Sequence, residues 1–152
     1  MTIQYLTKAN KWLEKNKKLA TGSKESNIHS LEQEYNVSLP KAYKEFLFLG
    51  GDEFLPIRRI NFELDWLKER ILPNEKEWLA EYEIDLKRAY WVFGEGEGAI
   101  TFFYLDEGDN PPVHVCEMEE KGHIDNWLRK VSKSFSEYID FWIEHYKEFG
   151  RG

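Results

Sequence analysis

The sequence predicts an α+β fold in which an antiparallel β-sheet is flanked by N-terminal and C-terminal helices. Apolar residues recur at helical spacing before residue 50 and again after residue 134. Between these stretches, residues 89–116 are rich in aromatic and β-branched residues interrupted by glycine-containing turns, which is typical of strands. The 152 residues show no internal repeat and no domain boundary, so we expect residues 1–152 to form a single domain.

Three helices are expected in the first third of the chain. The apolar pattern of residues 3–16 predicts an amphipathic helix. Pro40 favours the first turn of a later helix, where its missing N–H is not needed, and Gly50-Gly51 is typical of that helix's end. Between them, a middle helix is predicted by three apolar residues that share one face, namely Ile28, Leu31 and Tyr35.

The middle of the chain is less regular. Residues 54–60 predict a strand, and residues 62–86 predict one or two helices. Within the second stretch, Asn74 followed by Glu77 matches the capping pattern of a helix start.

A run of strands and a final helix complete the predicted fold. Residues 90–93, 100–105 and 113–116 predict three consecutive strands, which favours an antiparallel meander with the helices packed on one of its faces. Ser134 with Glu137 forms a capping box that predicts the start of the last helix.

The charge distribution argues against nucleic-acid binding. The net charge of the chain is −7, and residues 51–120 alone carry 7 Lys or Arg against 18 Asp or Glu. Proteins that bind nucleic acid normally cluster positive charge on one face, whereas an acidic region attracts basic proteins. We therefore expect a basic protein partner and no direct contact with nucleic acid.

Compartment is inferred from cysteine content and hydropathy. The chain has a single cysteine, Cys116, which cannot form an internal disulfide and fits a reducing compartment. No apolar run resembles a secretory signal or approaches the roughly 20 residues that span a bilayer. These observations predict a cytoplasmic protein without membrane contact.

The motifs that could carry catalysis are incomplete. The glycines of residues 94–98 do not have dinucleotide-loop spacing, and the acids of residues 106–110 are out of register for calcium. His114 and Cys116 share a strand face and His123 lies nearby, so these three residues are candidate metal ligands. Structural zinc sites require four well-spaced ligands, and the sequence leaves open whether these three residues bind a metal. No base is fixed beside Cys116, so we expect no enzymatic activity, no cofactor and no catalytic residues.

The second and third predicted helices carry the most specific motifs of the chain. They read Ile28-x-x-Leu31-Glu32-x-x-Tyr35 and Leu39-Pro40-x-x-Tyr43-x-x-Phe46-Leu47-x-x-Gly50-Gly51. Further motifs follow in Trp91-x-Phe93-Gly94, Phe103-Tyr104-Leu105, Pro112-Val113-x-Val115 and Ser134-Phe135-x-x-Tyr138-Ile139-x-x-Trp142. In this order the motifs resemble those of the SUKH superfamily. The resemblance covers residues 24–146 and leaves residues 1–20 as a variable N-terminal helix. Because these positions also have structural explanations, they identify a fold and not a site.

The resemblance implies an immunity protein that neutralises a cognate bacterial polymorphic toxin. We expect 1:1 binding of the toxin's C-terminal domain, most simply a nuclease and an RNase before a DNase, by occlusion of its basic cleft. The alternatives are a non-catalytic regulatory scaffold and an aromatic-lined carbohydrate-binding domain. The candidate toxin-binding residues are the acids of the middle region, namely Asp52, Glu53, Glu95, Glu97, Asp106, Glu107, Asp109, Glu117, Glu119 and Glu120.

Overall fold

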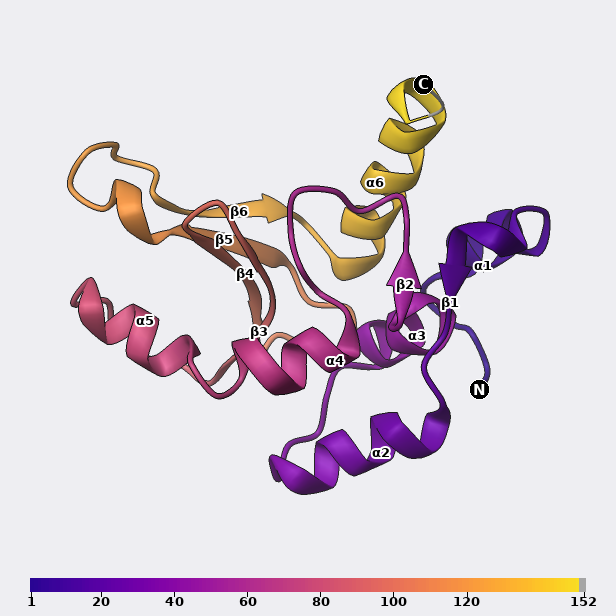
Figure 1. Cartoon of the computed structure of the whole chain (residues 1–152), viewed down its shortest axis with the longest axis horizontal. Helices are drawn as coiled ribbons and strands as arrows, with labels where there is room; N and C mark the ends of the chain where they lie inside the picture. Colours follow the sequence, from indigo (N-terminus) through magenta and orange to yellow (C-terminus); the bar gives the residue numbers. More distant parts are fainter. Residues whose placement is uncertain (151–152) are drawn as a thin grey trace.

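A four-stranded antiparallel sheet occupies the centre of the computed structural model, which describes residues 1–150 (Figure 1). The strands lie side by side in chain order and are β3 (Tyr90–Gly96), β4 (Ala99–Tyr104), β5 (Val113–Glu117) and β6 (Leu128–Ser132). The α+β class and the three predicted strands are confirmed. Strand β6 was not predicted, because its sequence carries three polar residues and little alternation.

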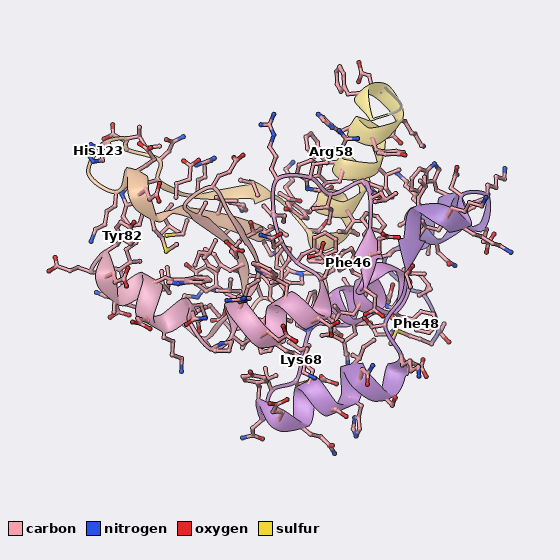
Figure 2. The ribbon with its side chains drawn as sticks, in the orientation of Figure 1. Phe46, Phe48, Arg58, Lys68, Tyr82 and His123 are labelled. Carbon is pink, nitrogen blue, oxygen red and sulfur yellow. The ribbon has the colours of Figure 1, made fainter. Side chains whose placement is uncertain are left out.

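Helices α3 (Lys41–Gly50) and α6 (Phe135–Phe149) cover one face of this sheet. Their aromatic side chains meet those of the strands, with ring centroids 5.3 Å apart for Tyr43 and Phe103 and for Phe93 and Phe135. All four side chains are buried, and full burial of each stabilises the fold by about 2 kcal/mol. Phe46 of α3 lies in the same interior (Figure 2).

Helix α5 (Glu75–Glu81) lies on the opposite face. The hydroxyl of Tyr90, which points away from Phe103, donates a 2.7 Å hydrogen bond to the buried carboxylate of Glu75. The ammonium of Lys121 donates to the carbonyl oxygens of Tyr82 and Glu83, each at 2.8 Å. Helical structure thus covers both faces (Figure 1), and the expectation of a single covered face is wrong.

The N-terminal part adds a small second sheet. The chain runs through α1 (Thr7–Glu14), the 3₁₀ turn η1 (Lys17–Leu19), β1 (Ala20–Thr21) and α2 (Glu25–Glu34). Strand β1 pairs antiparallel with β2 (Glu53–Phe54). Of the strand predicted over residues 54–60, only Phe54 belongs to β2, which it forms with the preceding residue, Glu53. Pro56 lacks the N–H that a longer ladder would need.

Several helix boundaries differ from the predicted ones for local reasons. Residues 64–71 form a short α-turn, α4 (Leu64–Trp66), that runs into a π-helical turn, η2 (Leu67–Ile71). The predicted cap at Asn74 is wrong, because its side chain donates backwards to the Arg70 carbonyl at 2.8 Å, although α5 does begin at the next residue. At α6 the predicted cap is confirmed, since the Ser134 hydroxyl accepts from the Glu137 N–H.

None of the helices formed by residues 1–150 has both the length and the apolar character that a bilayer crossing demands.

Candidate partner-binding surface

The ten candidate acids lie in three separate places. Glu95, Glu97, Glu117, Glu119 and Glu120 gather at one end of the sheet. The β3–β4 turn lies there beside the end of β5, since Ala99 pairs with Glu117, and β5 continues into the 3₁₀ turn η3 (Met118–Glu120). Asp106, Glu107 and Asp109 lie between β4 and β5 at the other end, and Asp52 and Glu53 adjoin β1. The single acidic face expected from the sequence is therefore three patches.

The acids at the far end of the sheet are occupied by contacts within the chain. Asp106 forms a 2.6 Å ion pair with Arg88, and this hydrogen bond lowers the pKa of the Asp106 carboxyl. Asp109 accepts a hydrogen bond from the Lys41 N–H at the start of α3, 3.2 Å away. Glu107 lies 3.3 Å from the imidazole of His114. Asp109 thus fixes the β4–β5 loop against α3, and Asp106 and Glu107 fix it to Arg88 and to His114 of β5, which are structural roles.

Two of the acids near the β3–β4 turn also have internal partners. The Glu95 carboxylate accepts from the Asn61 amide at 2.9 Å and from the Trp66 indole N–H at 2.8 Å. Glu117 forms a 2.8 Å ion pair with Arg129. Glu97, Glu119 and Glu120 are exposed and form no ion pair with any residue from 1 to 150. Their charges are the ones that a partner could meet.

A small pocket opens beside these free acids. Trp78 and Glu81 of α5 line it together with Tyr82, the residue that follows the helix, and so do Glu95 and Glu119. Its volume is about 190 Å³, below the roughly 300 Å³ at which small-molecule sites begin. The pocket therefore fits one long side chain of a partner. An acidic, aromatic-walled pocket favours a lysine or arginine, whose charge meets carboxylates while its stem packs on the rings.

The sequence contained a signal for this pocket that composition alone did not indicate. Glu81 and Tyr82 follow Trp78 by three and four residues, so all three lie on one side of α5 and its C-terminal end. What the spacing could not reveal is that this face lies beside the β3–β4 turn. We call Glu97, Glu119 and Glu120 together with Trp78, Glu81 and Tyr82 the turn-end surface.

The β3–β4 turn holds Glu97 in an uncommon backbone conformation. Glu97 has φ +55° and Gly98 has φ +78°, as in the hairpin turns that need two positive φ angles. Glycine adopts this conformation freely, whereas a glutamate there costs about 1 kcal/mol relative to a residue such as Asn. Side chains in such conformations cluster at functional sites.

The groups suited to nucleophilic or metal chemistry are not assembled into a site. Burial raises the pKa of the Cys116 thiol to about 11, so the thiolate is scarce at neutral pH. Burial also lowers the pKa of His114, against the opposing effect of Glu107. Among residues 1–150, no three His, Cys, Asp or Glu side chains are placed to hold a metal ion, and His114, Cys116 and His123 do not form such a group.

Comparison with known proteins agrees with the resemblance found in the motifs. A search of curated proteins found no match. A family model described as the SMI1 / KNR4 family (SUKH-1) matches residues 22–140, a stretch that runs from just before α2 into α6 and leaves α1 outside. Because the match covers well over half of the sequence in one continuous stretch, the chain belongs to the SMI1 / KNR4 family (SUKH-1).

Proposed function

We propose that this protein is an immunity protein that binds a cognate bacterial toxin in the cytoplasm and neutralises it. Membership of the SUKH-1 family over residues 22–140 is the observation that carries the proposal, since it supports the function implied by the motif resemblance. The inhibitor acts by binding alone. The high pKa of the buried Cys116 thiol is in keeping with a role that needs no nucleophile.

The toxin domain most compatible with the turn-end surface is a nuclease. An enzyme that cleaves a polyanion needs a basic cleft, and a compact acidic surface can occupy such a cleft. The free carboxylates of Glu97, Glu119 and Glu120 would meet the rim of that cleft. The pocket beside Trp78 and Tyr82 would take one of its basic side chains. One such surface per chain supports 1:1 binding, and an RNase is favoured over a DNase.

Strain at the β3–β4 turn supports the same surface. The turn keeps Glu97 in the left-handed region although Asn or Gly would be more stable there. An energetic cost retained in an exposed loop is expected where the side chain serves recognition.

The test is co-expression with the toxin domain. We expect a large toxin gene immediately upstream of this one, and its C-terminal domain should arrest growth when it is produced alone. Co-production of this protein should restore growth, and the two chains should elute together as a 1:1 complex. If growth is not restored or no complex forms, the immunity function is wrong.

A further inference from the structure

The segment that contains α1 and η1 is basic, although the net charge of the chain is −7. Residues 8–18 contain one glutamate and five lysines, namely Lys8, Lys11, Lys15, Lys17 and Lys18. All five lysines are exposed, and none forms an ion pair with any residue from 1 to 150. This segment is therefore a local reversal of the charge of the chain.

Three of the lysines form a row. Lys8, Lys11 and Lys15 are three and four residues apart, so they lie along one side of α1 and its C-terminal end. Burial raises the pKa of the Asp140 carboxyl of α6, and the Lys8 ammonium opposes this effect. Because Asp140 thus partly balances Lys8, a binding site for an anion would be built on the four lysines that follow.

A pocket of about 660 Å³ opens where these lysines approach α6. Three lysines and one glutamate line it, together with Trp12 of α1 and Tyr146 of α6. The two rings meet edge to face with centroids 6.0 Å apart, an arrangement that leaves at least one face of each ring uncovered by the other. The volume lies within the roughly 300–1,000 Å³ of ligand sites, so the pocket can admit a nucleobase with its sugar.

The pocket has a rigid support. The Glu45 carboxylate accepts hydrogen bonds from the N–H groups of Tyr5 and Leu6, directly before α1, at 2.9 and 3.0 Å. The Asn16 amide donates to the carbonyl oxygen of Trp12 at 2.8 Å, which fixes the chain where α1 ends. A ligand would therefore meet a surface that is already ordered, so little conformational entropy is lost on binding.

Positive charge beside aromatic rings favours a single-stranded nucleic acid. Proteins that bind single strands without sequence preference combine a basic groove that follows the phosphates with aromatic rings on which bases stack. The carboxylates of an acidic peptide would contact the lysines and leave the rings unused. A lipid surface is disfavoured, because Ala9 and Leu13 on the apolar face of α1 are buried in the protein and cannot insert.

The acidic turn-end surface is distant from this pocket. Helix α1 and helix α5, which contributes to the turn-end surface, lie at opposite ends of the longest axis of the molecule (Figure 1). Exposed charges that are separated by more than about 10 Å are largely screened at physiological salt. The acids of the turn-end surface therefore do not cancel the attraction of an anion to α1.

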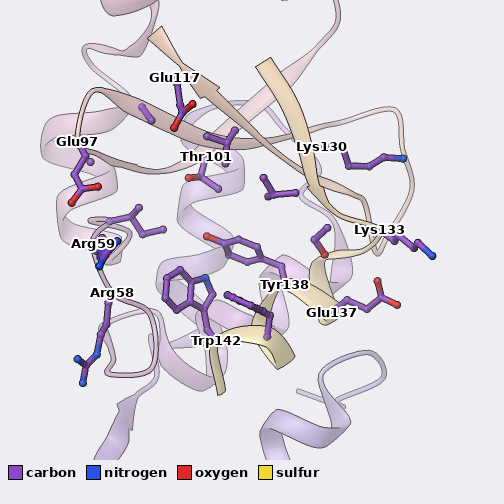
Figure 3. Close-up of a pocket in the computed structure, with 17 residues that line it drawn as sticks. Arg58, Arg59, Glu97, Thr101, Glu117, Lys130, Lys133, Glu137, Tyr138 and Trp142 are labelled. Carbon is purple, nitrogen blue, oxygen red and sulfur yellow. The ribbon is translucent and has the colours of Figure 1, made fainter. Parts of the chain in front are cut away.

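A second groove, of about 790 Å³, lies beside Phe141 and Trp142 of α6 (Figure 3). It does not suit a nucleic acid, because its lining includes the carboxylates of Glu97, Glu117 and Glu137. Figure 3 also shows the side chains of Lys130 and Lys133 directed away from it. The pocket between α1 and α6 is thus the better candidate for binding an anion.

We propose that α1, η1 and Tyr146 form a binding site for single-stranded nucleic acid. The ammonium groups of Lys11, Lys15, Lys17 and Lys18 contact phosphates, and a base stacks on the ring of Trp12. The site lies outside residues 22–140, the stretch that the family model matches, and does not depend on the proposed function. It departs from the expectation of no contact with nucleic acid, which was drawn from the total charge and from residues 51–120.

The first test measures binding of the full-length chain to a fluorescein-labelled dodecauridylate by fluorescence anisotropy. We expect a dissociation constant of roughly 1–100 µM at physiological salt. Lys15→Glu with Lys18→Glu should weaken binding about tenfold and make the slope of log K against log salt shallower by about 1.4, since each lost phosphate contact removes about 0.7. Lys68→Glu with Lys130→Glu makes the same change of charge on η2 and β6 and should leave both quantities nearly unchanged.

The second test asks whether the bases contribute. Trp12→Leu keeps an apolar side chain against Tyr146 but has no ring, so it should weaken binding about tenfold, whereas Trp12→Phe should keep most of the affinity. Thermal unfolding checks that both variants are folded. The natural protein should also bind an abasic strand of the same length about tenfold more weakly than the dodecauridylate. This last comparison is decisive even if Trp12→Leu does not fold.

The proposal is overturned if the dodecauridylate does not bind at micromolar concentrations, or if the Lys15/Lys18 variant binds as tightly as its control. It is also overturned if the abasic strand, or polyglutamate of equal charge, binds as tightly as the dodecauridylate, because the surface would then recognise negative charge alone. None of these measurements involves the toxin. Their failure would leave the immunity function standing, and failure of the co-expression test would leave this site standing.

Discussion

At the scale of single residues, Glu45 holds the N-terminal segment onto the rest of the protein. Its fully buried carboxylate accepts hydrogen bonds from the N–H groups of Tyr5 and Leu6, at 2.9 and 3.0 Å, and from the Lys41 ammonium at 2.9 Å. Burial alone would raise its pKa, but the hydrogen bonds from Leu6, Lys41 and Tyr5 outweigh burial and hold the pKa below its ordinary value of 4.5. The first helix begins at Thr7, directly after these two residues, and not at residue 3.

Glu45→Gln is expected to lower the free energy of unfolding by about 2 kcal/mol, because an amide keeps the shape but loses the charge-assisted hydrogen bonds. A carboxyl with a depressed pKa in the folded state contributes stability above its unfolded pKa and loses it as pH falls through the folded pKa. Urea denaturation of the natural protein should therefore show a loss of stability below about pH 4.5. Part of this slope should be missing in Glu45→Gln, and an unchanged slope would contradict the role given to Glu45.

A substitution at Glu97 is expected to raise the free energy of unfolding, in contrast to Glu45→Gln. Glu97→Asn should raise the free energy of unfolding by about 1 kcal/mol, because Asn tolerates the left-handed conformation that this turn requires. Glu97→Ala removes the same charge but keeps the strain, so it should give no such gain. Thermal unfolding of the two variants separates the two effects. Equal stabilisation by both would show that charge repulsion, and not backbone strain, is what destabilises the turn.

At the scale of elements, a buried polar pair, Glu75 and Tyr90, joins α5 to the sheet. Burial raises the pKa of the Glu75 carboxyl even though the Tyr90 hydroxyl donates to it, and burial together with Glu75 raises the pKa of Tyr90 as well. A carboxyl with a raised pKa favours the folded state when protonated and opposes it as pH rises through the folded pKa. The attachment of α5 is therefore weakest at neutral and alkaline pH.

Tyr90→Phe should cost about 2 kcal/mol at neutral pH, because it leaves the buried Glu75 carboxylate without its donor. Glu75→Gln keeps an acceptor for the Tyr90 hydroxyl and removes the buried charge, so it should be neutral or stabilising. Denaturation at roughly pH 5 and pH 7.5 should show that the advantage of Glu75→Gln grows with pH. A larger loss for Glu75→Gln than for Tyr90→Phe would mean that the ionised carboxylate has favourable contacts besides Tyr90.

The elements also show where local sequence patterns are sufficient. The capping box at Ser134 and the apolar stripe of α6 were predicted because a helix start and an amphipathic face are encoded within a few residues. Strand β6 was missed because Leu128–Ser132 carries only two apolar residues, and it is a strand through its pairing with β5. Edge strands need only one neighbour and tolerate polar sequence, so no local pattern identifies them.

At the scale of the whole molecule, the distribution of charge decides which surfaces can recognise a partner. The sequence places an excess of acid between residues 51 and 120, but in the fold Asp106 is paired with Arg88, Glu117 is paired with Arg129, and Asp109 accepts a backbone hydrogen bond. Glu97, Glu119 and Glu120 remain without an ion pair among residues 1–150, and Glu97 also lines the neighbouring groove beside α6.

Reversal of Glu119 and Glu120 to Lys is expected to weaken the toxin complex about tenfold and to flatten its salt dependence between about 50 and 500 mM salt. Glu14→Lys with Glu34→Lys makes the same change of charge on α1 and α2 and should leave the affinity nearly unchanged. Binding and its salt dependence can be followed by surface plasmon resonance. Equal effects of the two pairs would mean that the toxin responds only to overall charge and that the turn-end surface is not its docking site.

The sequence by itself determined the fold class, most of the helices, three of the four central strands and the family. These depend on periodicity, capping and turn residues, which act over short stretches of chain. Only the tertiary structure decided which acids are free, because a carboxylate is engaged by residues distant in sequence, as Asp109 is hydrogen-bonded by the start of α3 and Glu95 by Trp66. The pocket at Trp78 and the groove beside Phe141 could not be predicted from the sequence for the same reason. Each is formed by segments that come together only when the sheet and its helices pack.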